Sequence, residues 1–587
     1  MIKQIQKILL LVILISISVH AKEFFVTTTA ELSSAISLSK PGDVIVMKNG
    51  IWQNILINFQ NNGNSSFPIT LKAEKNGEVI VSGKSNLRIA GNYLVVDGLV
   101  FKNGYSVSSQ AVVEFRTSSG IESNYSRLTN TSIVDYNPTD AKTDYKWISL
   151  YGTHNRVDHC YLKGKTHIGT TLVVWLSNKP NYHLIDSNYF AYRPVFPENG
   201  AETIRIGTSD WSMYDSFTTV EYNYFEECNG ETEIISSKSC GNIYRYNTFK
   251  NCQGTLTLRH GNRCIVEGNY FFCGRKTDSG GIRIIGEDHK VINNYIEDSY
   301  GTSYKAGITI MNGVPNSPLN RYYQVKRAIV ANNTIVNARM SLNVGAGKDS
   351  ELSLAPLDCI IANNIFHSTQ SPLVTFTDTP INMIWSGNIF NGATIGMTLP
   401  ADNYNFNPQL VKGNDNIYRL QSGSMAIDKA SSAYNYTSKD FDGQTRIIND
   451  IGADEFSNDP IMINPVGSKD VGPEYLRATS IEKVEGKTIP AEFRLEQNYP
   501  NPFNPTTEIR YEIKNAAHVT LKVCDMLGRE LATLVDEYKQ AGSYKSQFSI
   551  RQTDGGQVHN SQFSSGVYFY TFKAGDYSQT KKMILLK

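Results

Sequence analysis

The stretch Cys264-Ile265-Val266-Glu267-Gly268-Asn269-Tyr270-Phe271 contains two short runs of β-forming residues on either side of a polar turn. An asparagine followed by a β-former and an apolar residue, as in its last three residues, recurs along the chain at Asn188, Asn223, Asn247, Asn269, Asn294, Asn333, Asn364 and Asn388. The shortest intervals are 22 to 25 residues, and the longer ones leave room for inserted loops. One such unit cannot bury its apolar side alone, so the repeat predicts coils stacked on one another.

The repeat predicts an all-β fold, a right-handed parallel β-helix, in which equivalent side chains form ladders along the axis. A leucine-rich repeat has a similar period but needs an LxxLxLxxN signature that is missing here, and the blades of a propeller are longer. The repeated asparagine is expected to be structural, because asparagine at a turn bonds its own backbone and tolerates the left-handed conformation. A short helix over residues 31–38 is expected to cap the first coil.

The charge of the chain is balanced, with 56 Lys and Arg against 55 Asp and Glu in 587 residues and a formal net charge of +1. This balance excludes the electrostatic footprint of a general nucleic-acid or anionic-membrane binder and leaves only local charged patches. The 44 Gly, 33 Tyr and 25 Phe favour short strands and tight turns over an all-α fold. No nucleic-acid partner is therefore expected.

Residues 1–21 are typical of a signal peptide, with basic residues, an apolar run from Ile8 to Val19 and a small-residue ending at Ala21. A membrane anchor is disfavoured because the run is short and no second one follows, so no transmembrane segment is expected in the mature chain. Export would permit disulfides, yet four of the eight cysteines recur at intervals of twelve and no CxxC occurs. We therefore expect free thiols packed inside the coils, not disulfides or a zinc site.

The repeat fades near residue 400, and the remaining chain changes in composition. Residues 440–453 are interpreted as the turn that closes the β-helix, and they do not have the ligand pattern of an EF-hand. Alternating apolar and polar residues at 508–513 predict a small antiparallel β-sandwich. The predicted parts are a signal peptide at 1–21, a parallel β-helix domain at 22–456, a linker at 457–490 and a C-terminal domain at 491–587.

Glu231 and Glu233 stand two residues apart within the segment 229–238. If this segment is a strand, alternation places both carboxylates on one face, where they repel each other unless a cation or a proton lies between them. Oxygen ligands of this kind suit calcium better than zinc or copper. The pair therefore predicts a Ca²⁺ site.

Three cations follow at nearly the spacing of one coil, since Arg259 comes 21 residues after Lys238 and Arg283 comes 24 residues after Arg259. They are expected to lie on neighbouring coils as a basic stripe beside the acidic pair. Such a stripe on an otherwise neutral protein suits an anionic polysaccharide. Spacing alone leaves open a solvated surface of alternating charges.

The C-terminal domain resembles the sorting domain of the type IX secretion system in the motifs QNYPNPFNP at 497–505, DMLGR at 525–529 and KKMILLK at 581–587. The resemblance covers the whole domain. It implies the type IX secretion machinery as a partner, passage across an outer membrane, and then release or attachment to the cell surface. A carbohydrate-binding sandwich is the alternative, but this domain has no Trp to stack on a sugar ring.

The segments GETEIISSKS at 230–239 and LRHGN at 258–262 resemble polysaccharide lyase family 6, which contains alginate lyases and chondroitinase B. The resemblance covers about residues 23–455 and implies a calcium-dependent β-helix enzyme. It implies that Lys238 is the Brønsted base and Arg259 the Brønsted acid. It also implies that His260 and Arg283 contact the substrate, and that calcium is bound by Asn199, Glu231 and Glu233.

Together these inferences predict a secreted or surface-attached lyase that cleaves a uronate polymer by calcium-assisted β-elimination. Alginate is favoured over dermatan sulfate because no cluster of arginines for sulfate stands out. The expected activity is of the poly(β-D-mannuronate) lyase type, with mannuronate or guluronate preference left open. The alternatives are a dermatan sulfate lyase, a non-catalytic polysaccharide-binding surface protein and a β-helix glycoside hydrolase. The hydrolase is disfavoured because carboxylates two residues apart on one strand do not flank a glycosidic bond.

Overall fold

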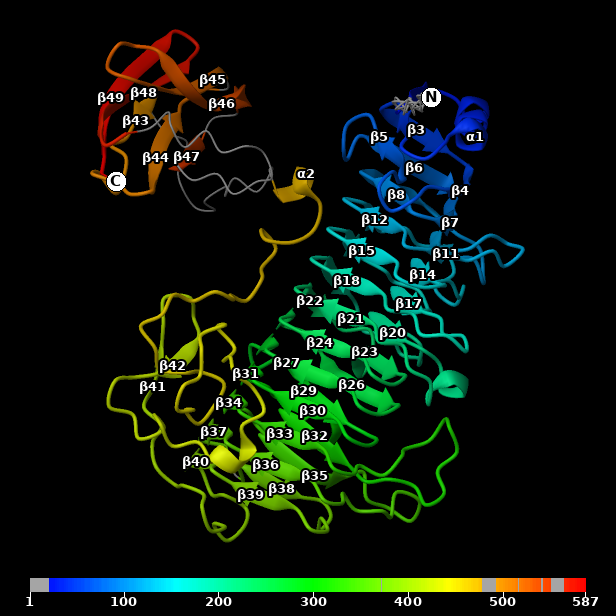
Figure 1. Cartoon of the computed structure of the whole chain (residues 1–587), viewed down its shortest axis with the longest axis vertical. Helices are drawn as coiled ribbons and strands as arrows, with labels where there is room; N and C mark the ends of the chain where they lie inside the picture. The colour runs from blue at the N-terminus through cyan, green and yellow to red at the C-terminus, as the bar shows by residue number, and fades with distance from the viewer. Residues whose placement is uncertain are drawn as a thin grey trace, which may run out of the picture. The chain divides into compact units, whose positions relative to one another are not determined.

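The computed structural model describes residues 21–370, 372–477, 492–515, 517–539, 542–549 and 564–586. The predicted signal peptide lies outside these residues except for Ala21. The chain divides into two compact units, Met1–Arg477 and Ala478–Lys587 (Figure 1). None of the helices in the described part of the chain has the length and apolarity needed to cross a membrane.

The first unit is a β-helix of three long parallel sheets, named sheets A, B and C, which wind around one core (Figure 1). Sheet A consists of β1 (Glu23–Val26), β2 (Val44–Met47), β5 (Ile69–Ala73), β8 (Leu94–Asp97), β12 (Arg127–Thr129), β15 (Arg156–Asp158), β18 (Leu184–Asp186), β21 (Thr219–Glu221), β24 (Ile243–Arg245), β27 (Ile265–Glu267), β30 (Lys290–Ile292), β33 (Ile329–Ala331), β36 (Ile360–Ala362) and β39 (Ile384–Ser386). Sheet B consists of β3 (Gly50–Gln53), β6 (Val79–Lys84), β9 (Leu99–Tyr105), β13 (Ser132–Val134), β16 (Tyr161–Lys163), β19 (Tyr189–Arg193), β22 (Tyr224–Cys228), β25 (Thr248–Lys250), β28 (Tyr270–Phe272), β31 (Tyr295–Glu297), β34 (Thr334–Val336), β37 (Ile365–Ser368) and β40 (Ile389–Gly392).

Sheet C carries five of the seven residues predicted for the site. It consists of β11 (Ser123–Asn124), β7 (Asn86–Asn92), β10 (Val113–Glu114), β14 (Ile148–Leu150), β17 (Leu172–Val174), β20 (Ile204–Ile206), β23 (Glu233–Lys238), β26 (Gly254–His260), β29 (Ser279–Ile284), β32 (Ile308–Met311), β35 (Leu342–Ala346) and β38 (Val374–Phe376), with β4 (Leu56–Asn62) beside β7. Each coil contributes one strand to each sheet, and neighbouring strands pair in parallel. The predicted fold, a right-handed parallel β-helix, is confirmed.

Inward-pointing side chains stack along the axis of the β-helix. Phe190, Phe225, Phe249 and Phe271 lie in consecutive coils of sheet B, with ring centroids 4.9, 4.6 and 4.5 Å apart. Seven of the eight cysteines are buried, and all eight are free thiols. This confirms the prediction that cysteine serves here as a small apolar side chain.

The helix α1 (Thr29–Leu38) covers the first coils and contacts β1, β2 and β4. It begins with a capping box, in which the Thr28 hydroxyl accepts from the Glu31 N–H and the Glu31 carboxylate accepts from the Thr28 N–H. Leu32, Ala35 and Ile36 are buried against the core. The expected capping helix is thus present, and it begins two residues earlier than predicted.

The repeated asparagines form one hydrogen-bonded ladder at the corner between sheets A and B. The side-chain N–H of each donates to the side-chain oxygen of the next at 2.8–3.0 Å, from Asn188 through Asn388 to Asn403. The left-handed conformation belongs to the residue before the asparagine, as in Tyr222 (φ 52°) and Tyr246 (φ 54°). The predicted structural role is confirmed, but the asparagines serve mainly by bonding one another.

Residues 440–453 do not close the end of the β-helix, in contrast to the interpretation from sequence. Phe441 packs on the outer face of sheet B, 5.4 Å from the ring of Tyr270 and 6.1 Å from that of Tyr295. The Tyr270 hydroxyl donates to the Phe441 carbonyl at 3.0 Å. The outward tyrosines of β28 and β31 supply an apolar surface, which this segment covers together with β41 (Leu410–Lys412) and β42 (Tyr418–Leu420) (Figure 1).

The first part of the predicted linker, residues 457–477, belongs to the β-helix unit. The Gly472 N–H donates to the Ser187 carbonyl at 2.8 Å, and the hydroxyls of Tyr475 and Ser132 lie 2.6 Å apart. Tyr475 lies in the short helix α2 (Glu474–Arg477). The lack of periodicity in this segment therefore reflects irregular packing on the coils, and residues 478–490 lie outside the described part of the chain.

The second unit holds two antiparallel sheets around its own core, in agreement with the predicted small β-sandwich. Its apolar residues alternate with polar ones, as in β44, so each sheet has one buried face. The first sheet consists of β43 (Arg494–Leu495), β44 (Thr506–Ile513) and β47 (Gly542–Ser549), and the second of β46 (Glu530–Lys539), β45 (Ala517–Cys524), β48 (Gly566–Ala574) and β49 (Tyr577–Leu585).

Candidate functional site

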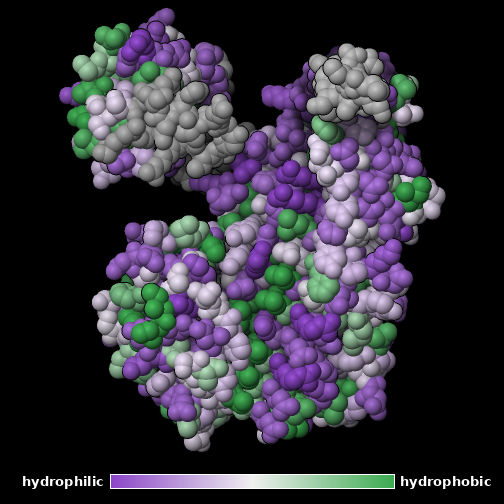
Figure 2. All heavy atoms as spheres, in the orientation of Figure 1, coloured by the Kyte–Doolittle hydropathy of each residue, from purple (hydrophilic) through white to green (hydrophobic). Residues whose placement is uncertain are grey.

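A cavity of about 610 Å³ lies over the outer face of sheet C, against β23, β26 and β29. Hydrophilic residues occupy much of the visible face of this unit, with hydrophobic patches between them (Figure 2). Six of the seven residues predicted for the site line this cavity: Asn199, Glu231, Glu233, Lys238, Arg259 and Arg283. Residues that are up to 84 positions apart in the sequence therefore meet because the coils stack in register.

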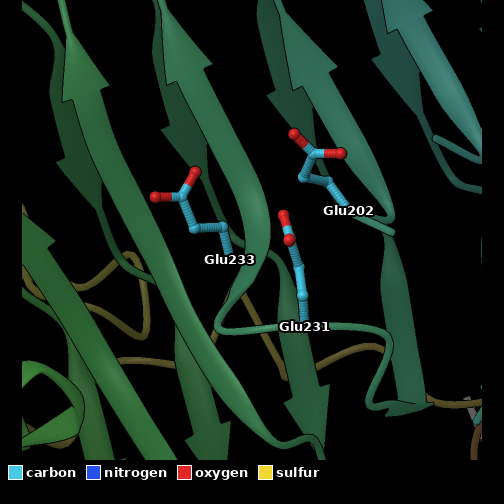
Figure 3. Close-up of side chains that lie close together, drawn as sticks. All are labelled: Glu202, Glu231 and Glu233. Carbon is cyan, nitrogen blue, oxygen red and sulfur yellow. The ribbon is translucent and has the colours of Figure 1, made fainter. Parts of the chain in front are cut away.

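Three carboxylates lie close together here, those of Glu202, Glu231 and Glu233, whose oxygens lie within 4.8 Å of one another (Figure 3). Glu231 and Glu233 line the cavity, and Glu202 is buried beside them. Glu233 is the first residue of β23, but Glu231 lies in the bend before it, so strand alternation does not explain the pairing. The bend and a shift in register after Glu233 bring the two together. The expected proximity is correct, and its structural cause differs.

Glu202 was not recognised from the sequence as part of this group. It stands two residues before β20, and Ile204 of β20 pairs with Ile235 of β23, so Glu202 lies one coil before Glu233. The signal that could have found it is this one-coil interval. Asn199 lines the same cavity from the loop before β20, and no one-coil interval to another site residue indicates this position.

In the described part of the chain, the cations nearest to the acidic group lie 3.6 Å or more from its oxygens. One oxygen of Glu202, a residue only 2% exposed, has no hydrogen-bond partner. Burial, and then the nearby Glu202 and Glu233, raise the pKa of Glu231 to about 8. The Gly200 N–H donates to Glu231 at 3.2 Å. A hard cation would satisfy the orphaned oxygen and relieve this repulsion, so the donor set fits Ca²⁺.

The three predicted cations surround the carboxylates. Lys238 Nζ lies 3.8 Å from a Glu202 oxygen, Arg259 Nε lies 3.6 Å from Glu233, and Arg283 Nη1 lies 3.7 Å from the same oxygen of Glu233. Lys238 ends β23, and Arg259 and Arg283 belong to the next two strands of sheet C. The predicted basic stripe is thus present, on consecutive coils beside the acidic group.

His260 is the predicted site residue that does not line the cavity. It is 2% exposed and lies behind Arg259, with its ring nitrogens 3.3 Å from Ser209 Oγ and 3.4 Å from Arg259 Nη1. Burial, followed by the charges of Arg259 and Lys238, lowers the pKa of His260 to about 2. Its geometry is that of a neutral residue that supports Arg259.

Two tyrosines complete the cavity wall and were not found from the sequence. The Arg259 guanidinium lies 4.0 Å from the ring centroid of Tyr322, and the Arg283 guanidinium lies 5.0 Å from that of Tyr304. Tyr304 belongs to the 3-10 helix η2 (Ser303–Lys305) before β32, and Tyr322 belongs to the loop after β32. No repeat pattern predicts that their side chains reach the site. Arg283 also donates to the Tyr322 hydroxyl at 3.1 Å.

Comparisons with known proteins agree with this geometry. The family model for chondroitinase B matches residues 26–429, and that for the secretion system C-terminal sorting domain matches residues 497–586. A search of curated proteins returned no match.

Several solved structures are similar to the first unit. The PL6 family alginate lyase AlyGC is 36% identical with a TM-score of 0.69, over 77% of this chain and 58% of that one. A mannuronic acid specific polysaccharide family 6 lyase from human gut microbiota is 34% identical with a TM-score of 0.58, over 63% and 86% of the two chains. A PL6 family polysaccharide lyase from Pseudopedobacter saltans is 27% identical with a TM-score of 0.61, over 77% and 99%.

The chain spans 58% of the length of AlyGC, so the similarity concerns the β-helix and not all of that enzyme. The sorting domain of the second unit indicates type IX secretion to the outside of the cell or to its surface. Matches to the family model over more than half of the chain, and to family members over the β-helix, identify the first unit. The chain belongs to the chondroitinase B family, polysaccharide lyase family 6.

Proposed function

We propose that this protein is a secreted polysaccharide lyase that cleaves a uronate polymer, alginate in the first place, by β-elimination. The observation that carries the proposal is the meeting of Lys238, Arg259 and Arg283 with Glu231 and Glu233 in one open cavity of sheet C, beside the buried Glu202. Cations on the wall suit the carboxylates of an anionic polymer, and the acidic floor suits a cation that binds to them. Family membership and the alginate lyases among the similar solved structures point in the same direction.

Lys238 is the base in this proposal, and takes the proton from C5 of the uronate. A lysine must be neutral for this role, and Lys238 Nζ lies 3.8 Å from a Glu202 oxygen. Calcium held by Glu202, Glu231 and Glu233, with Asn199 beside them, would offset that carboxylate charge and neutralise the charge that develops on the substrate carboxylate. Arg259 and Arg283 hold the polymer carboxylates and keep Glu233 in place.

Dermatan sulfate is the second candidate substrate, because the matching family model is that of chondroitinase B. Alginate is preferred because the cavity wall offers two arginines, both of which this proposal assigns to carboxylates of the polymer, and no further arginine for a sulfate. A non-catalytic polysaccharide-binding protein would need no lysine against the acidic floor.

The experiment is to follow the ultraviolet absorbance of unsaturated uronate on mannuronate-rich alginate, guluronate-rich alginate and dermatan sulfate. Lys238→Ala is expected to lose about 10²–10⁴-fold in turnover while still binding polymer, since the loss is that of a general base. Lys250→Ala is the matched control, because Lys250 is an exposed lysine on the adjacent β25. No absorbance on any polymer, or a near-normal rate for Lys238→Ala, would contradict the proposal.

A further inference from the structure

We propose that Arg193, a buried residue behind the cavity, is a positioning residue for the calcium site and sets its affinity for Ca²⁺. The inference rests on the proposed function and deepens it, because it names the residue that holds the proposed ligands in place. These ligands come from two segments, residues 199–202 with Asn199 and Glu202, and residues 229–231 with Glu231. Arg193 does not line the cavity, so it acts only through the residues that it holds.

The backbone of Arg193 fixes the beginning of the 229–231 segment. Arg193 is the last residue of β19 and pairs with Cys228, the last residue of β22 on the next coil. Its carbonyl accepts the Asn229 N–H at 2.8 Å, which extends the pairing by one residue beyond the strands. The position of Glu231, two residues further on, therefore depends on a backbone that is anchored at Arg193.

The side chain of Arg193 holds the 199–202 segment. Its Nε donates to the Ala201 carbonyl at 2.7 Å, and Ala201 is the residue before Glu202. Its Nη2 donates to the Gly169 carbonyl at 2.9 Å and its Nη1 to Thr171 Oγ1 at 3.3 Å. The guanidinium thus ties the 199–202 segment to the preceding coil.

The two segments pack closely against the guanidinium at Gly230. A Cβ atom at this position would lie 2.1 Å from the Ala201 carbonyl oxygen and 2.6 Å from Arg193 Nε, so only glycine fits without a shift. Next to this contact, the Gly200 N–H donates to Glu231 at 3.2 Å. A displacement of the Arg193 side chain would therefore move Glu231 relative to residues 199–202.

Arg193 is an unusual residue for the interior of the β-helix. It is 3% exposed, and in the described part of the chain its N–H groups donate only to neutral oxygens, those of His167, Gly169, Thr171 and Ala201. A charge buried without a counter-ion in contact costs stability, and an apolar side chain could fill the same space. Its hydrogen bonds to the ligand segments supply the reason for a guanidinium here.

Such restraint matters because the carboxylates of Glu202 and Glu231 repel each other until a cation lies between them. Segments that were free to move would separate the two carboxylates in the metal-free protein, and Ca²⁺ would have to bring them together again. Residues that orient metal ligands without contacting the metal typically contribute 10- to 100-fold in affinity, on the order of what is expected for Arg193.

The test is calorimetric titration of metal-free protein with Ca²⁺. Arg193→Lys keeps the positive charge but loses the planar fork that reaches Ala201 and Gly169 together. Its Kd for Ca²⁺ is expected to rise about 10- to 100-fold. Its turnover on alginate at saturating Ca²⁺ is expected to return to within about threefold of wild type, because bound metal restores the arrangement. Gly230→Ala disturbs the same contact from the other segment and is expected to raise the Kd as well.

Arg446→Lys is the matched control. Arg446 is also buried, and its guanidinium donates to the carbonyls of Asp450, Gly452 and Ala453, but it belongs to the segment that covers sheet B. This variant is expected to lower the Tm of the metal-free and of the Ca²⁺-loaded protein alike and to leave the Kd for Ca²⁺ unchanged. Arg193→Lys is expected to reduce the rise in Tm that a fixed Ca²⁺ concentration produces.

The outcomes separate this inference from the proposed function. A Kd for Ca²⁺ in Arg193→Lys within about threefold of wild type, or an equal rise in Arg446→Lys, would overturn the role of Arg193 and leave the proposed function standing. If Arg193→Lys does not fold, the Kd of Gly230→Ala decides in the same way. Wild-type protein that cleaves alginate without binding Ca²⁺ would overturn this inference and the calcium site. Wild-type protein that binds Ca²⁺ but cleaves no uronate polymer would overturn the proposed function alone.

Discussion

Among the described residues of the β-helix unit, two groups of three carboxylates occur, one at the cavity of sheet C and one beneath the segment that covers sheet B. In both, the carboxylate oxygens lie within 4.8 Å of one another; the members are Glu202, Glu231 and Glu233 in the first, and Asp440, Asp442 and Asp454 in the second. Their composition is the same, but their surroundings are not. The first group borders an open cavity, whereas all three members of the second are buried.

The aspartate group is satisfied by the protein itself. Arg419 Nε donates to Asp442 at 2.5 Å, and the N–H groups of Gln444 and Glu455 donate to Asp440 at 2.7 and 3.0 Å. The Leu420 N–H donates to Asp454 at 2.6 Å.

The glutamate group keeps an unpartnered oxygen on Glu202, and its nearest cations are 3.6 Å away or more. The comparison shows that the number of clustered carboxylates does not by itself indicate a functional site. The distinguishing feature is a carboxylate oxygen without a hydrogen-bond partner next to an open cavity.

The removal of calcium is expected to have the largest effect, and it tests the difference between the glutamate group and the aspartate group. We expect a chelator to reduce alginate cleavage by at least about 10²-fold and added Ca²⁺ to restore it, since the orphaned carboxylates would lose their cation. Glu231→Gln is expected to raise the Ca²⁺ concentration needed for half-maximal activity, and Asp442→Asn, measured on folded protein, to leave it unchanged. Full activity in excess chelator, with no metal in the purified protein, would contradict the calcium site.

The second prediction concerns stability at the aspartate group. Arg419→Ala leaves the fully buried Asp442 without its counter-ion, so the free energy of unfolding is expected to fall by about 3–5 kcal/mol. Turnover per folded molecule is expected to stay within about twofold. Arg245→Ala, which removes a partly exposed ion pair with Glu221, is the control and is expected to cost about 0–1 kcal/mol. Equal losses in the free energy of unfolding for Arg419→Ala and Arg245→Ala, measured by chemical denaturation, would contradict this prediction.

A pH dependence of stability is the third prediction. Burial raises the pKa of Asp454 from its usual 3.8 to about 8. The folded state thus holds this proton more tightly than the unfolded state, so its contribution to stability is full below pH 3.8 and is lost as pH rises through 8. Asp454→Asn is expected to remove that decline, on the order of a few kcal/mol between pH 4 and 8.

The buried histidines reduce stability as pH falls, whereas Asp454 reduces it as pH rises. They therefore serve as an internal reference. Burial lowers the pKa of His183 to about 3 and of His289 to about 4, so stability is lost as pH falls below 6.5. Thermal unfolding of wild type and Asp454→Asn from pH 4 to 9 separates the contribution of Asp454 from that of the histidines. Parallel curves for the two proteins would show that Asp454 does not retain its proton.

The smallest effect is expected from removing the C-terminal unit. Both carboxylate groups lie in the first unit, so a chain that ends at Arg477 should keep its turnover and calcium dependence within about twofold. A chain that ends at Phe456 loses the contact of Tyr475 with Ser132 and is expected to have a lower Tm at equal turnover. A folded but inactive chain ending at Arg477 would show that the second unit takes part in catalysis.

The parts of this molecule that could be predicted from sequence are those that the coil period controls. The Asn269 triplet and its copies predicted the β-helix, and one-coil spacing predicted that Lys238, Arg259 and Arg283 meet. Glu202 was missed although it stands one coil before Glu233, because it lies outside a strand, and Tyr322 was missed because a loop carries it back over sheet C. The placement of Tyr322 depends on long-range packing, which has no period in the sequence.

The asparagine ladder fixes one corner of the coils, and the length of a coil varies elsewhere. It ties each coil from Asn188 to Asn403 to the next at the corner between sheets A and B, whether the interval is 22 residues or 39. The corner between sheets C and A has single side-chain ties, such as that from the Thr218 N–H to Asn242 Oδ1 at 3.1 Å, and there the interval of 39 residues contains the loop that bears Tyr322. A coil can therefore lengthen by a loop beside the cavity while the ladder continues through it.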